Sequence, residues 1–269
     1  MRLKNLAIVA ALVLGFASSA FAGQSIKVSG STTILPIMQR VIEAYMKAHP
    51  DVEIAVSGGG SSNGIKALLD GTTDIAMASR TMKDKEMKLA EEKGLSPKQV
   101  VIALDAVIPI VNKSNPVSDL TIEQLQAIYA GKVTNWKEVG GNDEGIVVVS
   151  RDTSSGTYET WSKFVMGKTR VFPGALLQAS SGAVLQAVSK NPRAISYDGI
   201  GYVDSSVKAL TVNGVEGNDK TAKDKSFPIA RTLQVYIDGN PSGATKGLID
   251  FILSPEGQNI VKEAGFIKL

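Results

Sequence analysis

The first third of the chain alternates short β-branched runs with helical stretches, and this alternation constrains the fold more than any other feature of the sequence. Apolar residues recur at helical spacing along residues 34–46, and shorter helical patterns follow later. The strand patterns are residues 26–28, 52–56 and 74–78, and the helical patterns are 34–46, 65–69 and 83–93. This β-α-β-α-β order predicts a mostly parallel sheet covered by helices, and therefore an α/β fold.

An apolar run over residues 100–111, interrupted by Asp105 and Pro109, follows this block. The run is too long for one simple strand, so we interpret it as a segment that crosses between two parts of the fold. Thr121 and Gln124 have capping-box spacing, which predicts a helix that Gly131 ends. The remaining expectations are strands at 146–149, 194–197, 207–212 and 232–237, helices from about 157, over 182–189, and from 242 and 254, and an exposed loop over 213–225. We expect the strand at 232–237 to cross back from the second part of the fold to the first.

The N-terminal segment has the pattern of a secretory signal peptide. Arg2 and Lys4 precede an apolar run over residues 6–17, and Ala20-Phe21-Ala22 has the small-x-small pattern of a cleavage site. The alternative is a transmembrane anchor, but the run is shorter than the roughly 20 residues that a bilayer needs. We therefore expect cleavage after Ala22, no membrane insertion of the mature chain, and a location in a Gram-negative periplasm.

The composition excludes several classes of function. The chain has no cysteine and one histidine, His49. This excludes disulfides, thiolate metal sites, cysteine nucleophiles and multi-histidine metal sites. The net charge of +3 is too small to drive binding to nucleic acid. We expect no catalytic residues, no metal, no cofactor and no nucleic-acid partner.

Three small polar clusters each follow a predicted strand and open a predicted helix. They are Gly30–Thr33, Ser57–Asn63 and Arg151–Thr157, and Ser79-Arg80 ends the third strand in the same way. In a parallel sheet these positions lie at the carboxyl edge, where such sheets bind ligands. Free helix N–H groups, hydroxyl donors and the Arg151 guanidinium together favour an oxyanion site.

Each cluster also has a simpler explanation. A Ser/Thr cluster before a helix is most often a cap, a Gly-Gly-Gly-Ser-Ser run can be a flexible linker, and a lone arginine usually forms a surface ion pair. None of the clusters is a phosphate loop of the G-x-x-x-x-G-K-[ST] type or a G-x-S-x-G elbow. The occurrence of all three clusters at one predicted edge favours the ligand site.

At these residues the sequence resembles the PstS family, the periplasmic phosphate-binding proteins of phosphate ABC transporters. The resemblance covers essentially all of the mature chain. It rests on SGSTTILP (29–36), SGGGSSNGI (57–65), DIAMASR (74–80), DAVIPIVN (105–112), LTIEQLQAIYAGKVTNWKEVGG (120–141) and RDTSSGTYETW (151–161). It implies a type II periplasmic-binding-protein fold, with two lobes, a hinge and a ligand cleft between them. It also implies a dehydrated phosphate in that cleft and delivery to the membrane subunits of an ABC permease.

The resemblance assigns phosphate-binding positions residue by residue. They are Ser31, Thr32 and Thr33 in the first loop, Ser61 and Ser62 in the second, Ser79 at the end of the third strand, and Arg151, Ser155, Gly156 and Thr157 in the second lobe. One position departs from the pattern. Some members have an aspartate that accepts the phosphate proton directly after the Ser79 position, where this chain has Arg80. We therefore include Arg80 and Asp105 among the candidate residues, with Asp105 either accepting that proton or holding Arg80 or Arg151.

From this we expect one lobe from residues 24–106 plus 228–269 and a second from 107–227. The expected function is capture of inorganic phosphate by a monomer, without chemistry. Binding of another tetrahedral oxyanion (sulfate, molybdate or tungstate) is the alternative within the class, and a secreted phosphatase is the alternative outside it.

Overall fold

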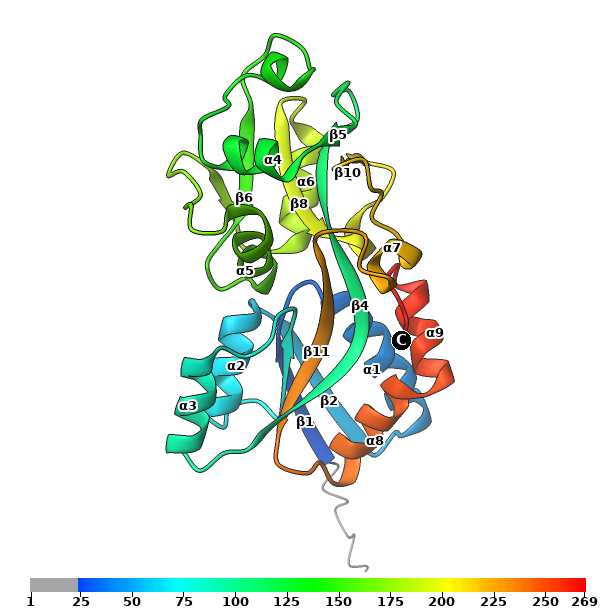
Figure 1. The fold of residues 1–269 in the computed structure, drawn as a ribbon. Helices are drawn as coiled ribbons and strands as arrows, with labels where there is room; N and C mark the ends of the chain where they lie inside the picture. Colours follow the sequence, from blue (N-terminus) through cyan, green and yellow to red (C-terminus); the bar gives the residue numbers. More distant parts are fainter. Residues whose placement is uncertain (1–23) are drawn as a thin grey trace, which may run out of the picture.

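The computed structural model describes residues 24–269, so the predicted signal peptide lies outside the described part of the chain. The fold has two α/β lobes connected by two long antiparallel strands, β4 (Pro97–Asn112) and β11 (Ala230–Asp238) (Figure 1). This confirms the expected fold class. It also confirms that the apolar run after residue 100 crosses from one part of the fold to the other.

The first lobe contains the predicted strand–helix alternation. Its elements are β1 (Gln24–Gly30), α1 (Leu35–Ala48), β2 (Val52–Gly58), α2 (Ser61–Leu69), β3 (Ile75–Ala78) and α3 (Asp84–Glu92), joined at the C-terminus by α8 (Gly243–Leu253) and α9 (Pro255–Glu263). β1 pairs in parallel with β2 and β3, and β11 pairs antiparallel with β3 and β4, which gives the order β2-β1-β3-β11-β4. The carboxyl ends of the three parallel strands therefore meet at one edge.

The second lobe continues the sheet from β4. Its elements are β5 (Asp119–Leu120), α4 (Ile122–Tyr129), the 3₁₀ turn η1 (Trp136–Val139), β6 (Val147–Arg151), α5 (Gly156–Trp161), the π turn η2 (Ser162–Met166), β7 (Leu176–Gln178), α6 (Ser181–Lys190), β8 (Ala194–Gly199), η3 (Ile200–Tyr202), β9 (Val207–Ala209), β10 (Thr211–Val212) and α7 (Asp219–Lys223). β6 is parallel to both β7 and β8, whereas β8 and β9 are antiparallel to β4. The ends of β6 and β8 thus face the first lobe.

The structure corrects three sequence predictions. β4 is one continuous strand of 16 residues. It changes partner along its length, pairing with β11 over residues 97–106 and with β8 over 107–111, so no neighbour has to match all of it. The predicted strand at 207–212 is two short strands, because β9 pairs with β4 and β10 with β5. The predicted loop over 213–225 contains the short helix α7, which the Asn218 side chain caps at the Thr221 amide, 3.0 Å away.

Local capping explains where several helices begin. Thr121 and Gln124 form the predicted capping box of α4, with side-chain to backbone distances of 2.8 and 3.1 Å. Ser254 accepts a hydrogen bond from the Gly257 amide at 3.2 Å and starts α9 as predicted. Ser242 stands before α8 but makes no side-chain cap bond.

The two largest hydrophobic cores among the described residues belong to different lobes, and a smaller one packs α2 and α3 of the first lobe. One is formed by residues of the first three strands, α1 and the C-terminal helices, and the other by residues 106–229 with Ile267. Each lobe thus buries apolar residues of its own, and polar groups are left at the boundary between the lobes. None of the helices within residues 24–269 is long and apolar enough to cross a membrane.

Candidate anion-binding site

Helix N-termini from both lobes converge where the two lobes meet. α1 and α2 begin just after β1 and β2 of the first lobe, and α5 and α6 begin just after β6 and β7 of the second. The lobes touch at these ends. The Ser62 amide donates to the Ser154 carbonyl at 3.0 Å, and the Ser154 hydroxyl donates to the Gly59 carbonyl at 3.2 Å. The sequence clusters predicted to share one edge are therefore brought together.

The first-lobe loop places three buried hydroxyl groups at this point. Ser31, Thr32 and Thr33 are at most 7% exposed. The Thr33 hydroxyl lies 2.9 Å from that of Thr157 in the second lobe. The Thr32 hydroxyl oxygen accepts a hydrogen bond from the Ser181 amide at 3.3 Å. Both threonines therefore contact the opposite lobe directly.

A second group of hydroxyls surrounds Gly156. The Ser61 hydroxyl accepts from the Ser79 amide at 3.0 Å, and the two hydroxyl oxygens lie 3.3 Å apart. A Cβ atom on Gly156 would lie 2.4 Å from the Ser61 oxygen and 2.6 Å from the Ser79 oxygen. Only glycine allows α5 to approach these serines so closely. Ser155 caps α5 by accepting from the Thr157 and Tyr158 amides, so its hydroxyl oxygen is committed to the helix.

Arg151 ends β6 and is 1% exposed. Its guanidinium donates to Thr32 Oγ1 at 3.0 Å, Ser181 Oγ at 3.1 Å and the Gln178 carbonyl at 3.1 Å. Within residues 24–269, no carboxylate lies within ion-pair distance of it. Burial lowers the pKa of Arg151. A buried cation without a contacting anion is energetically costly, so this arrangement favours an incoming anion.

Asp105 is bound to an arginine that the sequence analysis did not identify. Its partner is Arg231 on β11 rather than Arg80 or Arg151, because the antiparallel register places Arg231 directly opposite Asp105. Asp105 Oδ2 lies 2.8 Å from Arg231 Nε and 2.7 Å from Nη2, and Oδ1 accepts from the Ile200 amide at 3.0 Å. Burial raises the pKa of Asp105. Both of its oxygens are therefore occupied.

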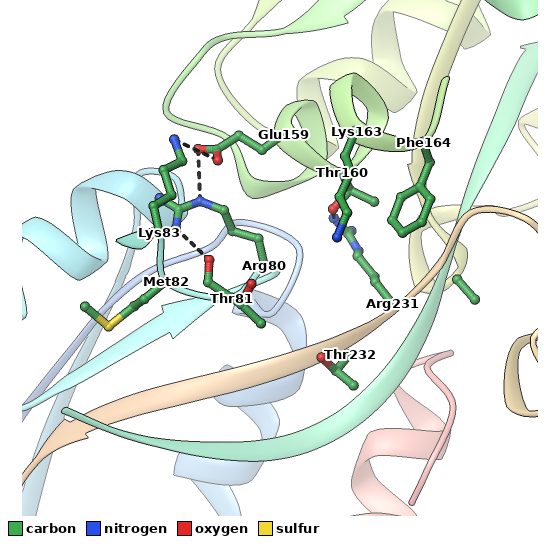
Figure 2. Close-up of a pocket in the computed structure, with 11 residues that line it drawn as sticks. Arg80, Thr81, Met82, Lys83, Glu159, Thr160, Lys163, Phe164, Arg231 and Thr232 are labelled. Atoms are coloured by element: carbon green, nitrogen blue, oxygen red, sulfur yellow. Dashed lines mark hydrogen bonds and ion pairs between the residues drawn. The ribbon is translucent and has the colours of Figure 1, made fainter. Parts of the chain in front are cut away.

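Arg231 also joins the two lobes. Its guanidinium donates to the Ser79 carbonyl at 3.2 Å in the first lobe. In the second lobe it donates to the hydroxyls of Thr157 at 3.1 Å and Thr160 at 3.3 Å. The Arg231 side chain is 5% exposed and lies beside Thr160 at the back of the pocket drawn in Figure 2. Arg231 thus brings a second buried positive charge to the site.

Arg80 lies at the border of the hydroxyl groups, and its guanidinium is already bound to carboxylates. Two carboxylates occupy its guanidinium: Glu86 at 2.7 and 2.8 Å, and Glu159 at 2.9 Å from Nε. Lys83 lies 2.8 Å from Glu159, and the Ser62 hydroxyl lies 3.0 Å from Arg80 and 3.1 Å from Glu159. This ion-pair network borders an open cavity of about 390 Å³ (Figure 2). Arg80 and Ser62 therefore connect the lobes at the edge of the site.

Asp198 is a further buried charge that the sequence analysis missed. It is fully buried near the end of β8, and its Oδ1 accepts from the Gly199 amide at 2.8 Å. The Ser181 hydroxyl also lies near this carboxylate and favours its charged form. Burial raises the pKa of Asp198 to about 6, against the opposing effects of the Arg151 charge and the Ser181 hydroxyl.

Sequence signals existed for two of the missed residues. Ser180-Ser181-Gly182 has the same Ser-Ser-Gly pattern before a helix as Ser154-Ser155-Gly156. Asp198 comes directly after a predicted strand, and Arg80 and Arg151 likewise follow predicted strands with one residue between. Arg231 had no such signal, because only the pairing of β11 with β4 brings it to Asp105.

The two lobes, the crossing strands and the polar cleft define a binding protein of the periplasmic-binding type. In agreement, the family model described as "PBP superfamily domain" matches residues 17–256. The phosphate-binding protein PstS of Staphylococcus saprophyticus is 33% identical, over 95% of this chain and 83% of the relative. The chain belongs to the PstS family of phosphate-binding proteins.

Solved structures agree with this assignment. A substrate-binding protein from Clostridium perfringens, assigned to a phosphate ABC transporter and containing bound phosphate, is 40% identical with a TM-score of 0.86, covering 91% of this chain and 100% of that one. An ABC-type phosphate transport receptor from Vibrio cholerae is 34% identical with a TM-score of 0.75, over 91% and 100% of the two chains.

Proposed function

We propose that this protein captures inorganic phosphate in the cleft between its lobes and delivers it to the membrane subunits of an ABC-type phosphate permease. The relatives named PstS and the related structure with bound phosphate support this function. The observation that carries it within this chain is Arg151, a buried guanidinium without a contacting carboxylate among residues 24–269, surrounded by hydroxyl groups. A tetrahedral oxyanion supplies the negative charge and the acceptor oxygens that such a group lacks.

The proposed ligand-binding set keeps most of the predicted residues and revises the rest. It comprises Ser31, Thr32, Thr33, Ser61, Ser79, Arg151, Gly156 and Thr157, with Arg231 added. Hydroxyl and amide donors can replace the hydration shell of the ion without many full charges. Arg80, Ser62 and Ser155 are assigned to lobe contacts and helix capping instead.

We propose that binding occurs without chemistry. A phosphatase needs an activated nucleophile or a metal cluster. The sequence has no cysteine, and its single histidine, His49, lies at the end of α1, stacked on Tyr45. Within residues 24–269, no group of three metal-binding side chains is present.

The remaining proposals concern location and organisation. Residues 1–22 act as a signal peptide that is cleaved after Ala22, and the mature chain works in the periplasm as a monomer. One lobe comprises residues 24–106 plus 228–269, and the other comprises 107–227. The chain passes between the lobes at residues 106–107 and 227–228, close to the Ala106–Ala230 end of the pairing between β4 and β11.

Isothermal titration calorimetry of the mature chain with phosphate, sulfate, arsenate and molybdate tests the function. We expect strong binding of phosphate and arsenate. Preferential binding of sulfate or molybdate would show that the ligand is another oxyanion. A chromogenic phosphate ester should give no turnover, and measurable turnover abolished by substitution of a site residue would support the phosphatase alternative.

A further inference from the structure

The pocket drawn in Figure 2 is separate from the proposed phosphate site. It is an open cavity of about 390 Å³, which is within the size range of small-molecule sites in proteins. The hydroxyls of Thr32, Thr33 and Ser61 do not line it. Arg231 is common to both, but its guanidinium already donates to Asp105, to the Ser79 carbonyl and to two threonine hydroxyls. The pocket therefore needs an explanation of its own.

One positive charge in this pocket is not neutralised. Three of its cationic side chains, Arg80, Lys83 and Arg231, contact carboxylates. The fourth is Lys163, which has no carboxylate within ion-pair distance in the part of the chain from residue 24 onward. Its ammonium lies 5.3 Å from the centroid of the Phe164 ring. The ammonium of Lys163 is thus available to an anion.

Apolar surface lies beside this charge. In Figure 2, the side chains of Lys163 and Phe164 extend from the second lobe toward β11, next to Arg231. Phe164 is 41% exposed, although it is a large apolar side chain. Met82 lines the pocket from the first lobe. A free ammonium next to an exposed aromatic ring suits an anion that carries a small apolar body, because the ring and the charge can each contact part of it.

The walls of the pocket come from both lobes. Residues 80–83 follow β3 of the first lobe, residues 159–164 belong to α5 and η2 of the second, and residues 230–232 belong to the crossing strand β11. A ligand that fills the pocket therefore touches the two lobes at once. Separation of the lobes would remove some of these contacts.

We propose that this pocket is a second ligand site, which binds a small organic anion and thereby favours the closed arrangement of the lobes. The effect on closure rests on the proposed function. A ligand that binds the closed arrangement better shifts the equilibrium toward it. Because phosphate is held between the same lobes, each ligand should strengthen the binding of the other by the same factor.

The test uses phenyl phosphate as the organic anion and phenol as its neutral counterpart. Each is titrated by calorimetry at pH 7.5 into the parent protein with a small excess of inorganic phosphate, so that the phosphate site is already filled. We expect phenyl phosphate to bind and phenol not to bind. Conversely, saturating phenyl phosphate should lower the phosphate Kd by about fivefold or more.

Three variants locate the site. Lys163→Met and Phe164→Ala should each weaken the binding of phenyl phosphate by about fivefold or more, because they remove the charge or the ring. Both side chains are exposed, so neither substitution opens a cavity in a core. Lys168→Met is the matched control: this lysine is exposed on the same segment but does not line the pocket, and its removal should leave the affinity unchanged.

Failure of phenyl phosphate to bind the phosphate-filled parent overturns the proposal, and so do equal affinities in the parent and both pocket variants. A higher phosphate Kd with phenyl phosphate would show that the probe enters the phosphate site, and an unchanged Kd would refute the coupling. A parent that does not bind phosphate refutes the proposed function instead. Titration of phenyl phosphate alone into the parent and the variants then still decides whether the pocket is a ligand site.

Discussion

Glu159 joins the two lobes through three side-chain contacts, and its substitution is expected to weaken phosphate binding without touching the ligand. It lies on α5 of the second lobe, and its three partners lie in the first. Its carboxylate is 2.9 Å from Arg80 and 2.8 Å from Lys83 (Figure 2). It also lies 3.1 Å from the Ser62 hydroxyl. We expect these contacts to be lost when the lobes separate, so they should favour the closed arrangement of the lobes.

The size of this bias follows from burial. The Arg80 side chain is 7% exposed, and hydrogen bonds to charged groups in such places are worth about 1.5–3 kcal/mol. Lys83 is 39% exposed, so its ion pair adds less than about 1 kcal/mol. Glu159→Gln leaves Arg80 paired with Glu86, so no charge is orphaned. We therefore expect a loss of about 2 kcal/mol, which corresponds to about 30-fold in the closing equilibrium.

Because the closed state holds the ligand, this loss should raise the phosphate Kd by up to the same factor and speed dissociation. Calorimetry and stopped-flow dissociation measure the two effects. Glu86→Gln is the matched control, since Glu86 binds the same arginine from within the first lobe at 2.7 and 2.8 Å. A Kd for Glu159→Gln within twofold of the parent, or a loss equal to that of Glu86→Gln, would refute the reasoning.

Three further perturbations test other parts of the site. Arg151→Met should weaken phosphate binding, measured by calorimetry, by about 1.5–3 kcal/mol. Arg151→Lys should recover only part of this loss, because an ammonium lacks the planar fork of a guanidinium. If Arg151→Met binds phosphate as tightly as the parent, Arg151 does not contact the ligand. Gly156→Ala should weaken phosphate binding, because its Cβ would lie 2.4 Å from the Ser61 oxygen, whereas Gly182→Ala meets nothing within 4 Å and should bind normally; equal affinities would contradict the packing argument. The third perturbation concerns stability. The pKa of Asp198 rises from 3.8 to about 6 on folding, so the folded state binds a proton that the unfolded state has released. The contribution of this carboxyl to the free energy of unfolding is therefore present below pH 4 and is lost as pH rises through 6. Urea unfolding without phosphate should therefore show Asp198→Asn gaining up to about 3 kcal/mol on the parent between pH 4 and pH 7, and parallel pH profiles would count against it.

Much of the fold could be predicted because its signals are local. The strands and helices of the first lobe follow from apolar periodicity and from the Ser254 cap of α9, and the start of α4 in the second lobe follows from its Thr121 cap. The positions of the polar clusters follow from parallel pairing, because it brings the ends of β1, β2 and β3 to one edge. Local patterns of this kind determine which residues stand at a strand end.

The contacts that the sequence did not predict depend on strand register or on short, exposed strands. Asp105 and Arg231 are 126 residues apart and meet only through the antiparallel pairing of β4 and β11. Ser181 was missed because the preceding strand, β7, has only three residues and is largely exposed. Arg80 stands at a strand end like a ligand residue, but Glu86 and Glu159 occupy its guanidinium.

The two buried arginines of the cleft have different surroundings, and this difference assigns their roles. Arg231 is neutralised by Asp105, so this pair is complete and holds the crossing strands and both lobes in register. Arg151 has no carboxylate within ion-pair distance among the described residues, so its charge is left for an anionic ligand. Departures from complete pairing of this kind are characteristic of functional sites.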